Sequence, residues 1–385
     1  MVGLLFGGQS SDKGISSFQG FCTALAGRIG TGNIAGVATA IAWGGPGALF
    51  WMWAIAFLGA GSAFAESTLG QLYKEEHDGE YRGGPAYYIE KGFGGTTFSK
   101  IYATLFAIVT VIAIGVLLPG VQSNSIAVSI NNAFGAEASF GGILGSTIAW
   151  GVKRGVYSNE AGQGTGPQAS SAAEVSHPAK QGFVQAFSVY VDTLFVCSAT
   201  GFMILMTGCY NTFNENTQKI MVENMPGYSI PDIGPVYTQN AINTLIPGFG
   251  GAFVAIALFF FAFTTLMAYY YIAEVNLTYL VKKFTGGKSS KLSINCLRIV
   301  LLGMTAFGCV KSAGLAWMMG DIGVAMMAWL NLIAILALSK KALLCFNDYE
   351  SQLKAGVPRD EISFDPIKLG IKGADFWEQK HNTAK

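Results

Sequence analysis

A short glycine-rich stretch, Gly27-Arg28-Ile29-Gly30-Thr31-Gly32-Asn33, carries the residues best suited to binding chemistry. It lies inside an apolar segment, about 15–43, that is long enough to cross a bilayer. Three glycines and an arginine disfavour a continuous lipid-facing helix, and non-helical backbone is tolerated at membrane depth only where it lines a cavity or is buried. A helix broken here offers free N–H groups to an anion and free carbonyl groups to a cation. The stretch therefore predicts a binding site in a membrane transporter.

A second apolar segment is interrupted in the same way, between Gly151 and Pro167, where glycines alternate with polar residues. Two glycine-broken segments in one chain point to an inverted-repeat transporter whose site lies near the bilayer midplane. Either segment alone would be a weak signal, and the two together favour this class of protein.

The composition agrees with a membrane protein. Of 385 residues, 51% are hydrophobic and only 12% are charged, whereas charged residues make up about 25% of soluble domains. The formal net charge is +1, and the sequence has no basic cluster with interleaved aromatic residues. Both observations argue against a nucleic-acid partner. The sequence contains no recognisable nucleophile–base pair, phosphate-binding loop or metal-ligand spacing. We therefore expect neither an enzyme nor a cofactor.

Eight apolar segments are candidate membrane spans: about 15–43, 46–73, 99–133, 140–174, 181–208, 248–281, 293–312 and 316–345. Lysine is frequent in the loops 74–100 and 282–291 and in the tail, whereas 209–247 holds only Lys219. The positive-inside rule places the lysine-rich loops and the tail in the cytoplasm and 209–247 outside. We expect a transmembrane domain over 1–345 and a polar cytoplasmic tail with little fold of its own over 346–385.

The chain resembles the alanine or glycine:cation symporter family, the sodium:alanine symporters of bacteria and archaea. The matching stretches are Gly14–Gln19, Ala26–Ile41, Gly44–Trp53, Gly83–Ile89, Gln122–Ser125, Gly151–Gly166, Asp192-Thr193 and Phe261–Thr265. The resemblance implies an all-α polytopic membrane protein with the leucine-transporter-type fold, in which ten core helices form two inverted repeats. It also implies symport of a small neutral amino acid, alanine or glycine, with sodium as the coupling ion, across the plasma membrane of a prokaryote.

The resemblance assigns a substrate site to the first break and the spans beside it. With Gly30 before them, Thr31, Gly32 and Asn33 would begin the second half-helix and hold the substrate carboxylate on their N–H groups. Gln122 would face the substrate, and Tyr269 stands where the family commonly places tryptophan near it. Two alternatives remain open: the glycines could serve close helix packing, and Gln122 could join neighbouring helices.

The resemblance also implies a cation site. Ala26 and Ile29 would end the first half-helix and leave carbonyl groups without partners, which suit a hard cation such as sodium. The carbonyl of Phe261 and the hydroxyls of Thr264 and Thr265 would complete the set. Alternatively, each hydroxyl bonds to the carbonyl four residues earlier in its own helix.

Six charged residues within the apolar segments are costly in a membrane and must find a partner or water. We expect internal ion pairs or gates rather than direct ligands at these positions, which are Arg28, Glu66, Lys153, Arg154, Glu160 and Asp192.

The chain departs from the family pattern in two places. Only Met1–Lys13 precedes Gly14, where the family has a further helix. The third span ends at Asn131–Gly135 and is followed at once by the segment leading into Gly151, where the resemblance implies two further core helices, the fourth and fifth. The chain would thus have about eight spans in an incomplete fold. A truncated, transport-inactive copy of a symporter is the alternative function. Alanine versus glycine, sodium versus proton, and the oligomeric state stay open.

Overall fold

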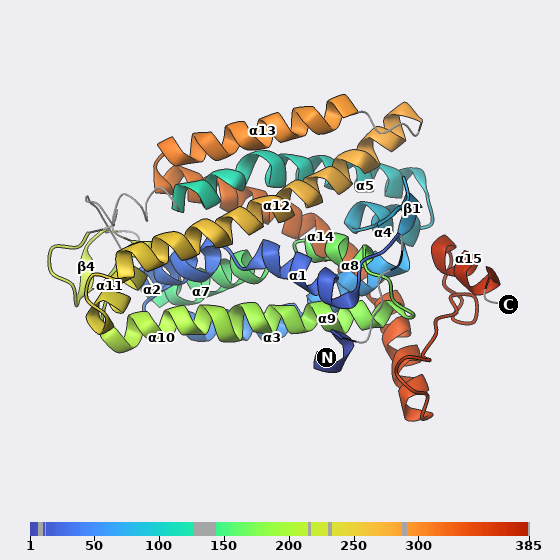
Figure 1. The fold of residues 1–385 in the computed structure, drawn as a ribbon, viewed down its shortest axis with the longest axis horizontal. Coiled ribbons are helices and arrows are strands. Elements are labelled where there is room, and N and C mark those ends of the chain that lie inside the picture. The colour runs from blue at the N-terminus through green and yellow to red at the C-terminus, as the bar shows by residue number, and fades with distance from the viewer. Residues whose placement is uncertain are drawn as a thin grey trace.

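The computed structural model describes residues 1–6, 11, 13–125, 144–214, 217–229, 233–286 and 291–383. The junction at which two core helices are predicted to be missing lies outside these residues. The described chain is built almost entirely of helices, most of which run along the long axis of the molecule (Figure 1).

Within the described part of the chain, six helices are long and apolar enough to cross a membrane. They span Ala48–Leu72 (α3), Thr97–Ser125 (from α5), Pro178–Thr207 (α9 to α10), Gly250–Thr285 (α12), Lys291–Val310 (α13) and Ala313–Lys354 (α14). Each has at least 18 residues, and about 20 residues cross the hydrocarbon core. The prediction of an all-α polytopic membrane protein is confirmed.

The remaining two predicted spans are broken, as their glycines indicate. The first consists of α1 (Ser17–Arg28) and α2 (Val37–Gly44), and the second of α7 (Leu144–Asn159) and α8 (Gly166–Ser171). Helix α1 begins with a capping box, in which the Ser16 side chain accepts from the Gln19 backbone and Gln19 reciprocates. It ends where Ile29 takes an extended conformation with φ −75° and ψ 93°.

Among the residues that the structure describes, three π-helical turns interrupt the spans: η2 (Gly32–Gly36), η3 (Ala113–Leu117) and η4 (Val191–Cys197). Turns of this kind widen a helix locally and are frequent at functional sites. Two of them, η2 and η4, lie close to the first break and contact each other. The helix before η3 is α5 (Thr97–Ile112), and η4 separates α9 (Pro178–Tyr190) from α10 (Ser198–Thr207).

The short polar elements gather at opposite ends of the molecule (Figure 1). One end holds β1 (Glu75–His77), β2 (Glu80–Arg82), α4 (Pro85–Gly92), α15 (Asp375–Thr383) and the C-terminus. The short helix η1 (Val2–Leu4), at the N-terminus, contacts α9. The other holds β3 (Asn211–Phe213), β4 (Ile220–Glu223) and α11 (Pro235–Leu245). Each pair of strands is antiparallel. This separation agrees with the charge pattern, which groups loop 74–100 with the tail and places 209–247 opposite.

The expectation that the tail has little fold of its own is wrong. Helix α14 continues to Lys354, and the segment after it folds back on the helical core. Trp377 is only 2% exposed, and its Nε1 donates to the carbonyl of Gln71 at 2.8 Å. Apolar residues spaced through a polar tail, with Phe364 and Ile371 among them, are buried in the same cluster and account for this packing.

Candidate functional site

The first break places two backbone N–H groups beside side-chain amide oxygens. The Gly30 N–H donates to Asn33 Oδ1 at 2.8 Å, and the Thr31 N–H donates to Gln122 Oε1 at 3.2 Å. Both groups are buried. N–H groups at the start of a helix have no carbonyl acceptor within that helix. They are therefore free to bind a carboxylate.

The structure brings most of the predicted substrate residues together. Gln122 Nε2 lies 3.4 Å from the Tyr269 hydroxyl, so Tyr269 joins the same group as Gly30 and Thr31. Gly32 differs, because a Cβ built there would lie 3.1 Å from the Cα of Ser158 on α7. Close helix packing, one of the alternatives for the glycines, therefore applies to Gly32.

Asn33 points its amide nitrogen away from the break toward η4. Its Nδ2 donates to Asp192 Oδ1 at 2.6 Å, and the Ser158 hydroxyl donates to Asp192 Oδ2 at 3.0 Å. The Thr193 hydroxyl donates to the same carboxylate at 2.9 Å. Asp192 thus holds Asn33 while Asn33 Oδ1 holds Gly30. Ser158 is not among the predicted site residues, because it is one of many polar residues in the second interrupted segment.

Three oxygen atoms of the predicted cation set converge beside the break. The Thr265 hydroxyl lies 3.3 Å from the Ile29 carbonyl and 2.9 Å from the Phe261 carbonyl. Thr265 is fully buried. A hydroxyl has one proton and can donate it to only one of these carbonyls at a time.

The other two predicted cation ligands lie differently. Thr264 is exposed, and its hydroxyl bonds within its own helix, 3.1 Å from the Phe260 carbonyl and 2.9 Å from the Phe261 carbonyl. Ala26 is half-buried on α1, one turn before Ile29.

Ion pairs form at some of the predicted charged positions. Arg154 Nη1 lies 3.0 Å from Asp321 Oδ1, and Lys153 Nζ lies 2.7 Å from Asp321 Oδ2. The Arg154 guanidinium also stacks over Trp317 at 4.0 Å. Asp321 was missed by the sequence reasoning, although it is the lone acidic residue of the last span before its polar end.

Buried charges near the breaks are held by neutral partners instead. Arg28 donates to Gln185 Oε1 at 3.2 Å and to the Ser188 hydroxyl. Glu66 accepts from the backbone N–H groups of Gly162 at 3.3 Å and Gly164 at 3.1 Å. The expectation of ion pairs thus holds for Lys153 and Arg154, whereas Arg28, Glu66 and Asp192 have hydrogen-bond partners.

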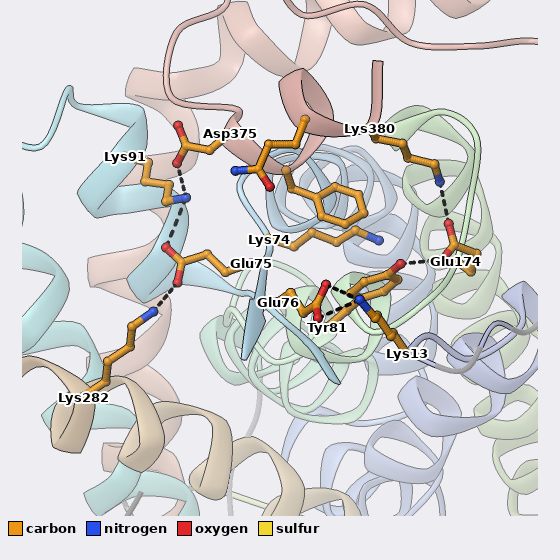
Figure 2. A pocket seen from close by; sticks show the side chains of 12 residues that line it. Lys13, Lys74, Glu75, Glu76, Tyr81, Lys91, Glu174, Lys282, Asp375 and Lys380 are labelled. Atoms are coloured by element: carbon orange, nitrogen blue, oxygen red, sulfur yellow. Dashed lines mark hydrogen bonds and ion pairs between the residues drawn. The ribbon is translucent and has the colours of Figure 1, made fainter. Parts of the chain in front are cut away.

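A cavity of about 760 Å³ lies far from the breaks, at the end that carries α4 and α15 (Figure 2). Ion pairs between lysines and carboxylates surround it, including Lys91 with Glu75 at 3.1 Å and Lys380 with Glu174 at 2.5 Å. Lys74 is fully buried among them, and its Nζ donates to the Ala173 carbonyl at 2.9 Å. Tyr81, Phe376 and Trp377 surround this ammonium, with ring centroids at 4.2, 4.6 and 5.8 Å.

Burial of Lys74 predicts a pH dependence of stability. Desolvation lowers the pKa of Lys74 to about 7, although the nearby negative charge of Glu174 acts to raise it. Between pH 7 and about 10 the unfolded chain therefore binds a proton that the folded chain does not, so the contribution of Lys74 to stability rises with pH in that window and is constant below it. The unfolding temperature of the wild type, minus that of Lys74→Met, should increase from pH 7 to pH 9. A difference that is flat or falls across this range would contradict the assignment.

Comparisons with known proteins also indicate a membrane transporter. The model of the sodium:alanine symporter family matches residues 1–135 and 128–363. YrbD of Bacillus subtilis (strain 168) is 51% identical over 99% of this chain and 90% of its own length. The sodium/proton-dependent alanine carrier protein of Bacillus sp. (strain PS3) is 44% identical over 98% and 97%. The sodium/alanine symporter AgcS of Methanococcus maripaludis is 32% identical over 86% and 83%.

These matches also bear on the predicted gap. The alignment with YrbD runs over 449 positions, more than the 385 residues of this chain, so part of YrbD has no counterpart here. The two matches to the family model overlap at residues 128–135. That overlap lies at the junction where the sequence predicts two missing helices.

Proposed function

Because the chain belongs to the sodium:alanine symporter family, we propose that its first helix break binds the alanine carboxylate and the sodium ion at adjacent positions. The chain is a multi-pass plasma-membrane transporter that couples alanine transport to sodium, and it is not an enzyme. The observation that supports the proposal best is the convergence of the Ile29, Phe261 and Thr265 oxygens beside the N–H groups of Gly30 and Thr31.

The alanine carboxylate would take the place of side-chain oxygens at the break. Gln122 Oε1 and Asn33 Oδ1 now accept from the Thr31 and Gly30 N–H groups. A carboxylate is the stronger acceptor at such donors, because the interaction is charge-assisted and lies at a helix N-terminus. Gln122, released from Thr31, would face the substrate with Tyr269 beside it. The same site would accept glycine, which differs from alanine by one methyl group.

Sodium would bind between α1 and α12. Hard cations prefer oxygen ligands, and here the Thr265 hydroxyl already lies close to the carbonyls of both Ile29 and Phe261. The Ala26 carbonyl, one turn earlier on α1, is the fourth proposed ligand. Thr264 was proposed with them from the family resemblance, and its outward position makes it the weakest member of the set. Ion and carboxylate would lie on either side of Gly30, so each would favour binding of the other.

The two broken spans support a leucine-transporter-type inverted-repeat fold, with the breaks as its paired centres. We assign the transport domain to residues 1–345 and a cytoplasmic segment to 346–385, which packs against the end that holds α4. Arg154, Lys153 and Asp321 would close the opposite, outer side of the site.

A transport-inactive, truncated copy is the second candidate. The observation that favours it is the internal stretch of YrbD without a counterpart in this chain. Sodium-driven accumulation of alanine in proteoliposomes distinguishes the two candidates.

The topology predicts which loops an impermeant thiol reagent can reach. In cells that express a chain freed of its own cysteines, Lys219→Cys should be labelled from outside, and Lys100→Cys should be labelled only after the membrane is permeabilised. Both side chains are exposed, so access rather than burial decides the result. Labelling of both positions in intact cells would contradict the orientation derived from the lysine-rich loops.

A further inference from the structure

A fully buried asparagine on α14, Asn331, ties the second helix break to two other helices. Its Nδ2 donates to Glu66 Oε2 at 2.7 Å and to the Gly162 carbonyl at 3.0 Å. Its Oδ1 accepts a hydrogen bond from the Tyr88 hydroxyl of α4. An asparagine amide offers two N–H donors and one carbonyl oxygen, and here both of its ends are engaged.

Glu66 of α3 completes the hold on this break. Its carboxylate accepts from the N–H groups of Gly162 and Gly164, which precede α8 and have no helical acceptor of their own. Both glycines have positive φ, +83° and +86°. The site is tight as well, because a Cβ at Gly164 would lie 3.1 Å from Asn331 Cγ and closer still to Pro85, the first residue of α4.

The same network lies next to the first break. A Cβ built at Gly166, the first residue of α8, would lie 2.9 Å from Arg28 Nη2 and 3.7 Å from Glu66 Oε1. Arg28 is the last residue of α1. Glu66 therefore lies within reach of both broken spans, and Asn331 connects it to α4.

We propose that Glu66, Asn331 and Tyr88 form a relay that couples the position of the second break to helix α4 at the inner end of the molecule. The three are positioning residues: none would touch alanine or sodium. The proposal rests on the proposed function, in which the inner side must open to release both solutes. A narrow cavity of about 10 Å³, lined by α1, α8 and α12 and including Ala169, lies between the breaks and that end. Loosening the relay would let α8 move and widen it.

Tyr88→Phe removes one hydroxyl from the relay and leaves Asn331 Oδ1 without that donor. Such a loss at a buried group shifts an equilibrium by roughly tenfold. Tyr87→Phe is the matched control, because Tyr87 is the neighbouring residue of α4, is also buried, and its hydroxyl makes no hydrogen bond among the described residues. Each variant is made in a full-length chain with Ala169→Cys and with Cys22, Cys296 and Cys309, the exposed cysteines of the described residues, replaced by serine.

The measurement is the rate at which N-ethylmaleimide labels Cys at position 169 in purified protein without sodium or alanine, with the unfolding temperature recorded alongside. We expect labelling about tenfold faster in Tyr88→Phe than in Tyr87→Phe. Equal rates in the two variants would overturn the proposal, including the case in which Tyr88→Phe only lowers the unfolding temperature. Because no solute is transported, the result is independent of whether the proposed ligand sites are correct.

A second pair of variants keeps the test decisive if Tyr88→Phe does not fold. Asn331→Ala removes the centre of the relay. Asn276→Ala removes a buried asparagine whose amide, within the described part of the chain, donates only to the Ile272 carbonyl of its own helix. Faster labelling at position 169 in Asn331→Ala alone supports the relay. Equal labelling in both variants contradicts it.

Discussion

Gly30→Ala should abolish sodium-driven alanine uptake. A Cβ at Gly30 would lie 2.6 Å from the Thr265 hydroxyl and 3.1 Å from Gln122 Oε1. The first distance is shorter than real Cβ atoms tolerate, so Thr265 must shift out of the proposed cation site, and the methyl group would also occupy space beside the proposed carboxylate position. Overpacking of this kind costs about 1–3 kcal/mol, and here it falls on both ligands at once. We expect apparent alanine affinity to fall by roughly 100-fold or more.

Gly303→Ala is the control for this change. Gly303 lies within helix α13, where a Cβ would meet no atom of the described residues within 4 Å. Uptake and unfolding temperature should match the wild type, since alanine also favours helix. If Gly30→Ala and Gly303→Ala transport equally well, the first break is not the binding site.

Thr265→Val should raise the sodium concentration for half-maximal uptake about tenfold, since it keeps the shape of the side chain but removes one of three converging oxygens. Thr264→Val makes the same chemical change one residue earlier, where the hydroxyl is exposed and bonds within its own helix. The geometry predicts a change of no more than about twofold there, as for other exposed substitutions. The measurement is initial alanine uptake over a series of external sodium concentrations.

Two outcomes would contradict this assignment. Unchanged sodium dependence in Thr265→Val would mean that its hydroxyl serves only its own helix. Equal, large effects of Thr264→Val and Thr265→Val would show that both hydroxyls bind the ion, as the family resemblance implies, although this structure places Thr264 outward.

The sequence was informative where a residue type is unusual in an apolar membrane span and therefore has few possible roles. Glycines inside apolar segments predicted both breaks, because glycine weakens a helix and permits positive φ, and Gly162 and Gly164 have such angles. Gln122 stood out as an amide in an apolar span, and it does bond to the first break. The same signal was available for Asn331, the lone amide among apolar residues of the last span, and was overlooked.

Other features depend on three-dimensional packing that a pattern does not contain. Successive residues of a helix point about 100° apart, so Thr264 and Thr265 differ in how they face α1, and the structure, not the sequence, indicates that Thr265 lies beside the Ile29 carbonyl. Trp377 lies in a polar tail between Phe376 and Glu378, and its burial depends on a cluster formed by distant helices. Asp192 holds Asn33 across 159 positions of sequence, a contact that no local spacing predicts.

The most direct test of the account is alanine accumulation by proteoliposomes that contain the purified 385-residue chain. With sodium outside and potassium inside, the account predicts that labelled alanine rises above its external concentration, that a sodium ionophore collapses the gradient of alanine, and that equal sodium on both sides prevents it. If folded protein gives no accumulation, or accumulation that does not depend on the sodium gradient, the chain is not a sodium-coupled symporter, and the truncated, transport-inactive alternative replaces the central claim.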